Sequence, residues 1–124
     1  MLKALVIDDE PSTLFMFNLF LEAYGCEVIT AENAAAGIEK FKKERPSIVF
    51  TDIKMPGMDG LDTLKMLKSI DPEVQVIVMT GHGDQDLMRQ AMEFKATAFL
   101  NKPIDRAALE KVLEEAAGNL PKKE

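Results

Sequence analysis

Short apolar runs alternate with longer segments of helical spacing along the chain, and this alternation limits the possible folds more than any other feature of the sequence. The apolar runs predict strands over residues 4–7, 27–30, 47–51, 74–79 and 98–100. The segments of helical period predict helices over residues 12–24, 34–44, 61–69, 84–94 and 106–117. Repeated strand–helix units are typical of α/β proteins built on a parallel sheet.

The first, third and fourth predicted strands are apolar at nearly every position. A strand without alternation is buried on both faces, so helices must cover both sides of the sheet and these three strands must lie at its centre. Asn33, Asp59 and Asp105 are candidate N-caps, and Gly25 follows the first helix. We therefore predict a doubly wound α/β fold around a five-stranded parallel sheet.

Composition and charge exclude several classes of protein. We expect one domain over residues 1–120, with residues 121–124 as a frayed tail or the start of a connection to a further segment. The net charge of −6 offers no basic surface to nucleic acid. No apolar stretch approaches the roughly 20 residues that cross a bilayer, and the single Cys26 suits a reducing compartment. We expect a cytoplasmic protein that binds neither nucleic acid nor membranes directly.

Polar residues follow four of the predicted strands. In open parallel sheets, ligands bind beyond the carboxyl ends of the central strands, so these residues should converge on one edge. They are, in chain order, Asp8, Asp9, Glu10, Asp52, Thr80 and Lys102.

The grouped carboxylates repel one another, and a bound cation would relieve this repulsion. An all-oxygen ligand set favours a hard ion such as Mg²⁺, which keeps several of its waters. With Lys102 and the Thr80 hydroxyl, the site would contain the positive charge and positioning that phosphoryl transfer requires. Asp52 lies on a central strand between the acidic pair and Thr80, and it is the candidate nucleophile.

Four segments of the sequence resemble the signature segments of response-regulator receiver domains. They are Val-Ile-Asp-Asp-Glu at 6–10, Thr-Asp-Ile-Lys-Met-Pro-Gly-Met-Asp-Gly at 51–60, Val-Met-Thr-Gly at 78–81 and Leu-Asn-Lys-Pro at 100–103. The resemblance spans nearly the whole chain, with each segment at the end of its expected strand. The family resemblance and the general rule for doubly wound α/β sheets together imply the flavodoxin-like strand order 2-1-3-4-5.

The resemblance implies that Asp52 is the phosphoacceptor. Asp9 and Asp52 would bind Mg²⁺ directly, Asp8 largely through water, and the Lys54 backbone carbonyl would complete the protein ligands. Lys102 and the Thr80 hydroxyl would contact the phosphoryl group. The donor would be a sensor histidine kinase or a histidine phosphotransferase, and no turnover of external substrates is expected.

The resemblance also implies a switch. Thr80 would move toward the phosphate and Phe99 would turn inward behind it, changing the surface of the fourth helix, fifth strand and fifth helix that a downstream effector domain or protein reads. The peptide bond before Pro103 is expected to be cis. Lys54 and His82 occupy positions that tune phosphate lifetime in receivers, although His82 between two glycines is more simply explained as an exposed loop residue.

Two further expectations concern helix ends and faces. Lys95 stands where many receivers have Gly, so it must adopt a left-handed conformation or end the fourth helix differently. Helical spacing assigns a core face to the first helix and predicts exposure of three apolar residues that could dock the kinase or phosphotransferase. The predicted core residues are Thr13, Met16, Phe17, Phe20 and Tyr24. The predicted docking residues are Leu14, Phe15 and Leu19.

Three alternatives remain. A haloacid dehalogenase-type phosphohydrolase would need Asp where Lys54 stands, and a flavodoxin-like nucleotide module would need a phosphate-binding loop where the chain has Asp8-Asp9-Glu10-Pro11. A degenerate receiver could act only as a scaffold. The sequence leaves open the cognate kinase, the signal, the output, the phosphate lifetime, phosphorylation-dependent dimerisation, and whether the chain is part of a larger regulator.

Overall fold

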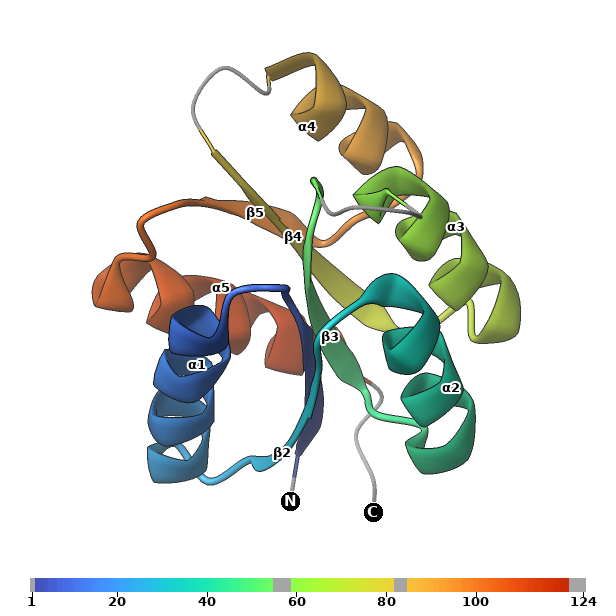
Figure 1. Ribbon diagram of the computed structural model, residues 1–124. Helices are drawn as coiled ribbons and strands as arrows, with labels where there is room; N and C mark the ends of the chain where they lie inside the picture. Colours follow the sequence, from blue (N-terminus) through green and yellow to red (C-terminus); the bar gives the residue numbers. More distant parts are fainter. Residues whose placement is uncertain (1, 55–58, 82–84, 121–124) are drawn as a thin grey trace.

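The computed structural model describes residues 2–54, 59–81 and 85–120, in which strands and helices alternate (Figure 1). The strands are β1 (Lys3–Ile7), β2 (Glu27–Ala31), β3 (Ile48–Asp52), β4 (Gln75–Thr80) and β5 (Ala98–Asn101). The helices are α1 (Pro11–Ala23), α2 (Ala34–Glu44), α3 (Gly60–Ile70), α4 (Gln85–Glu93) and α5 (Arg106–Gly118). No helix in these described ranges is long and apolar enough to cross a membrane.

The strands form one parallel sheet in the order β2-β1-β3-β4-β5. The prediction of a doubly wound sheet with the first, third and fourth strands at its centre is therefore confirmed. In β3 every residue is buried, as the unbroken apolar run predicted. At most of their ends the observed elements differ from the predicted ranges by one residue, and at the other ends they coincide.

Helices cover both faces of the sheet, and the core accordingly has two halves (Figure 1). On the face covered by α1 and α5, the rings of Phe17 and Phe50 lie 5.1 Å apart at a tilted angle. On the face covered by α2, α3 and α4, Phe41 and Leu64 are fully buried against the strands. Burial of each such side chain stabilises the fold by about 1.5 to 3 kcal/mol.

Local sequence signals fix several helix ends. The carboxylate or amide oxygens of Asn33, Asp59 and Asp105 accept hydrogen bonds from backbone N–H groups at the starts of α2, α3 and α5, which confirms the predicted caps. Gly25 follows α1 with a φ of 97°, a conformation that glycine adopts without strain. Lys95 has a φ of 68°, so of the two possible endings expected for α4 the chain adopts the left-handed one.

The prediction for the faces of α1 is wrong in part. Tyr24 was expected in the core, but its side chain is 41% exposed, whereas Leu21 is fully buried. Leu14 was expected to be exposed, but it is half-buried and packs against the core beneath α1. Phe17 is buried as predicted. Apolar residues occur on most sides of this helix, so the pattern alone does not define the side that faces the sheet.

The start of α3 lies directly against the end of β3. A Cβ atom added to Gly60 would lie 2.2 Å from the Ile53 Cα and 2.7 Å from the Asp52 carbonyl oxygen. The Gly60 N–H donates to the Ile53 carbonyl at 2.9 Å. Only glycine allows this close approach of backbones, which fixes the last residue of β3 at the carboxyl edge of the sheet.

Candidate functional site

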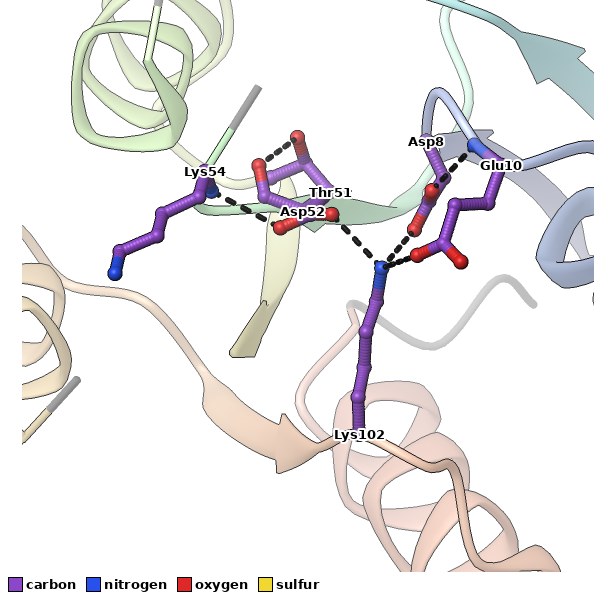
Figure 2. A network of polar contacts seen from close by, with 6 residues as sticks. All are labelled: Asp8, Glu10, Thr51, Asp52, Lys54 and Lys102. Carbon is purple, nitrogen blue, oxygen red and sulfur yellow. Dashed lines mark hydrogen bonds and ion pairs between the residues drawn. The ribbon is translucent and has the colours of Figure 1, made fainter. Parts of the chain in front are cut away.

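Side chains from three parts of the chain meet at the carboxyl edge of the sheet (Figure 2). Asp8 and Glu10 follow β1, Asp52 is the last residue of β3, and Lys102 follows β5. The central position of β1 and β3 brings the two groups of carboxylates together, as the sequence predicted.

Lys102 contacts three carboxylates at once (Figure 2). Its Nζ lies 2.8 Å from Asp52 Oδ2, 2.8 Å from Glu10 Oε1 and 2.9 Å from Asp8 Oδ2. Burial by itself lowers the pKa of the Lys102 ammonium, but hydrogen bonds to Asp52, Glu10 and Asp8 outweigh burial and raise that pKa above its ordinary value. Lys102 is therefore a fixed positive charge at every physiological pH.

Asp8 is the most deeply buried of the acidic residues. Its Oδ1 accepts a hydrogen bond of 2.9 Å from the Glu10 backbone N–H. Its Oδ2 forms the ion pair with Lys102 but receives no aligned hydrogen bond within the described part of the chain. Burial raises the pKa of the Asp8 carboxyl above its ordinary value, although contact with Lys102 opposes that shift. An anionic oxygen held in this way is short of partners.

Both oxygens of Asp52 are engaged. Oδ1 accepts a hydrogen bond from the Lys54 backbone N–H at 2.9 Å, and Oδ2 accepts one from Lys102 Nζ at 2.8 Å. The side chain is buried apart from a small exposed fraction. These contacts orient the carboxylate and hold its negative charge at the edge of the sheet.

The site also has the donor set of a hard-cation site. Oxygens of Asp8, Asp9, Glu10 and Asp52 all lie within 4.8 Å of one another. Mg²⁺ prefers oxygen ligands and keeps some of its waters, and exposed Asp9 and Glu10 leave the cluster open to solvent. The buried Asp8 Oδ2 without an aligned donor gives independent support, because such an oxygen gains most from a cation. The residues present fit a magnesium ion.

Thr80 ends β4 beside this cluster, but its hydroxyl is engaged elsewhere. Oγ1 donates toward Asn101 Oδ1 at 3.2 Å and lies 3.4 Å from Met88 Sδ. Phe99, the other predicted switch residue, lies on β5 with its side chain 39% exposed. The peptide bond between Lys102 and Pro103 is cis, as expected.

Sequence reasoning missed three residues that the structure brings into contact with the site. Glu10 was noted as acidic but not assigned a role, and its direct pairing with Lys102 could have been suggested only by its place after β1. Asn101 lies in the Leu-Asn-Lys-Pro segment but was assigned no role of its own, and Met88 belongs to no charged or catalytic pattern. His82 lies outside the described residues.

An apolar groove of about 450 Å³ lies between α1 and the start of α5. Its wall on α1 includes Phe15 and Leu19, which are 66% and 56% exposed. Phe20, Ile104 and Arg106 also line it, and the Arg106 guanidinium lies 5.6 Å from the centre of the Phe20 ring. The exposure predicted for Phe15 and Leu19 is therefore confirmed.

Fold and site together define a doubly wound α/β domain with a lysine and a carboxylate cluster at the carboxyl edge of its sheet. Comparison with known proteins identifies the family, since the model of the response regulator receiver domain matches residues 4–114. The chain belongs to this family and is a phosphoryl-accepting signalling switch of the two-component type.

Individual relatives in sequence and structure agree with this family assignment. The chain is 35% identical over 103 residues to sporulation initiation phosphotransferase F of Bacillus subtilis, covering 83% of each chain. It resembles the crystal structure of a response regulator receiver domain protein from Clostridium thermocellum, with a TM-score of 0.91, 38% identity and 95% of each chain covered. It is 32% identical to the Escherichia coli transcriptional regulatory protein GlrR over 90% of this chain, but spans only 25% of that protein.

Proposed function

We propose that Asp52 accepts the phosphoryl group from a phosphohistidine of a sensor histidine kinase or histidine phosphotransferase. An Asp52 carboxylate oxygen attacks phosphorus, the P–N bond breaks, and the histidine leaves with its electron pair and takes up a proton. The observation that carries this proposal is the placement of the Asp52 carboxylate, which the Lys54 N–H and Lys102 orient inside a carboxylate cluster.

In this proposal Asp9 and Asp52 bind Mg²⁺ directly, Asp8 binds it largely through water, and the Lys54 backbone carbonyl completes the protein ligands. The bound ion supplies positive charge to the oxygens of the transferring group. The buried Asp8 Oδ2, which has an ion pair but no aligned hydrogen bond, and the all-oxygen donor set support this assignment.

Lys102 and Thr80 would contact the phosphoryl oxygens. Lys102 already touches Asp52, so its ammonium can neutralise charge that develops next to that carboxylate. Lys54 and His82 would control access of water to the acyl phosphate and so set its lifetime. Hydrolysis of this bond is the only turnover that we propose, and external substrates are not consumed.

The output would be a change in the surface formed by α4, β5 and α5. Thr80 turns toward the phosphate and Phe99 turns inward, and a downstream effector domain or protein reads the altered surface. The same surface could support a phosphorylation-dependent homodimer. Residues 1–120 would form the receiver unit, followed by the tail at 121–124, and the protein would work in the cytoplasm.

The phosphoacceptor is tested by intact-protein mass after incubation with phosphoramidate or acetyl phosphate. We expect a Mg²⁺-dependent phosphate adduct on the wild-type chain and none on Asp52→Asn. Asp62→Asn, which changes an exposed carboxylate on α3, is the matched control and should label normally. Undiminished labelling of Asp52→Asn would refute the assignment.

We further propose that the groove between α1 and α5 docks the phosphodonor protein. Phe15 and Leu19 supply exposed apolar area beside the mouth of the site, whereas Leu14 contributes little because it packs inward. Phe15→Asp should slow transfer from the kinase that phosphorylates the wild-type chain, while labelling by phosphoramidate stays unchanged. Met66→Asp, an exposed apolar position on α3, is the control. Equal slowing of both variants would argue against the groove.

A further inference from the structure

The Thr80 hydroxyl is held by the side chains of Asn101 and Met88. Neither side chain belongs to the carboxylate cluster, and neither has been assigned a role above. Thr80 is fully buried, and its partner in the register of β4 and β5 is Asn101. The Asn101 Oδ1 and Met88 Sδ atoms lie 3.2 and 3.4 Å from Thr80 Oγ1. A hydroxyl has one proton to donate, so these acceptors direct it toward β5 and α4 and not toward Asp52.

The backbone of Thr80 is fixed independently of its side chain. The Lys102 N–H donates to the Thr80 carbonyl at 2.7 Å, which continues the ladder between β4 and β5 one residue past the end of β5. Reorientation of Thr80 toward a phosphoryl group therefore requires rotation of its side chain, and that rotation must break the contacts with Asn101 and Met88.

We propose that Asn101 and Met88 are positioning residues that hold Thr80 away from Asp52 in the unphosphorylated chain and thereby set the threshold of the switch. This inference rests on the proposed role of Asp52 as phosphoacceptor. A buried hydroxyl that loses its acceptor is costly, so these contacts stabilise the unphosphorylated arrangement alone. Phosphorylation must overcome this free-energy difference between the two orientations of Thr80 before the switch can turn. Removal of the acceptors makes the difference smaller.

The two acceptors are not equal. Asn101 offers a carbonyl oxygen, which is a strong acceptor, whereas the thioether of Met88 is a weak one. Met88 also lies on α4, a helix whose only fully buried residue in the described range is Ala91. Release of Thr80 would therefore remove one of the contacts that tie α4 to the sheet, which links the site to the proposed output surface.

The test compares Asn101→Ala and Met88→Leu, each alone and combined with Thr80→Val. Phosphoramidate labelling with Mg²⁺ gives the rate, and the ¹³C methyl resonance of Thr80 in the unphosphorylated chain reports its orientation. We expect Asn101→Ala to label about three- to tenfold faster and Met88→Leu to show a smaller gain. In Asn101→Ala the methyl resonance should move toward its position in the phosphorylated wild type.

The matched control is Asn119→Ala, which also removes one side-chain amide. Asn119 Nδ2 donates to Gln75 Oε1 at the opposite edge of the sheet, so this variant should leave rate and resonance unchanged. The inference would be overturned if the wild type is labelled but Asn101→Ala and Met88→Leu change neither the labelling rate nor the Thr80 methyl resonance. An equal acceleration by Asn101→Ala in the Thr80→Val background would overturn it as well. Absence of any adduct on the wild type would instead overturn the proposed function, and this inference with it.

Discussion

One lysine sets the charge balance of the site. Lys102 Nζ contacts Asp8, Glu10 and Asp52, and its side chain keeps only 20% exposure. Isolated surface ion pairs contribute little to stability, but removal of the cation from a buried group leaves charge without compensation. The residue that would neutralise the transferring phosphoryl group therefore also stabilises the carboxylates before phosphorylation.

Lys102→Met should lower the free energy of unfolding at pH 7 without Mg²⁺ by roughly 2 to 3 kcal/mol. Burial already raises the pKa of Asp8, and loss of its contact with Lys102 raises it further. A group whose pKa is raised in the folded chain contributes stability at pH values below its pKa in the unfolded chain. This contribution is lost as the pH rises through its pKa in the folded chain. The deficit should therefore shrink from pH 7 toward pH 4.

Urea unfolding across this pH range measures the deficit of Lys102→Met. Lys111→Met, which removes an exposed lysine on α5, is the control and should cost less than about 0.5 kcal/mol at every pH. A deficit that is the same at pH 4 and pH 7 would show that Asp8 is not the group that Lys102 compensates.

At the scale of an element, the position of α3 determines where Asp52 stands. The missing Cβ of Gly60 lets the first residue of this helix touch the backbone at the end of β3. Gly60→Ala should lower the free energy of unfolding by about 2 kcal/mol, because backbone must move to accommodate the methyl group. Phosphorylation by phosphoramidate should slow by roughly tenfold, since the carboxylate of Asp52 moves with that backbone.

Gly118→Ala provides the comparison for Gly60→Ala. Gly118 ends α5, and an added Cβ there meets no atom within 4 Å. The better helix propensity of alanine should make this variant equal to the wild type or more stable by up to about 1 kcal/mol. Calorimetry and the phosphoramidate assay check both variants, and a Gly60→Ala protein that matches the wild type in both would contradict the close approach as the cause.

The elements that could be predicted from the sequence are those whose pattern has one solution. The unbroken apolar run of β3 requires a central strand, and Asp52 at its end must then lie at the carboxyl edge. The orientation of α1 could not be predicted, because apolar side chains occur around most of its circumference. The partners of Thr80 could not be predicted either, since Asn101 and Met88 meet its hydroxyl only through the packing of α4 and β5.

At the scale of the whole molecule, the carboxylate cluster has two possible sources of positive charge. Without metal, Lys102 is shared among Asp8, Glu10 and Asp52. A Mg²⁺ ion bound to the same carboxylates would compete for them, and it would stabilise the folded chain because the unfolded chain has no such cluster. The affinity of the site for Mg²⁺ is therefore linked both to the stability of the fold and to Lys102.

We expect Mg²⁺ at about 100 times its Kd to raise the free energy of unfolding by about 2.7 kcal/mol, or the Tm by roughly 10 °C. Protons compete with Mg²⁺ at Asp8, whose pKa is raised, so the Mg²⁺-dependent increase in Tm should decline as the pH falls toward that pKa. Asp8→Asn should lose most of the increase, and Asp62→Asn should keep it.

Lys102→Met should bind Mg²⁺ several-fold more tightly, because the competing ammonium is gone. Weaker binding by Lys102→Met in thermal and calorimetric titrations would mean that lysine and metal occupy separate parts of the site.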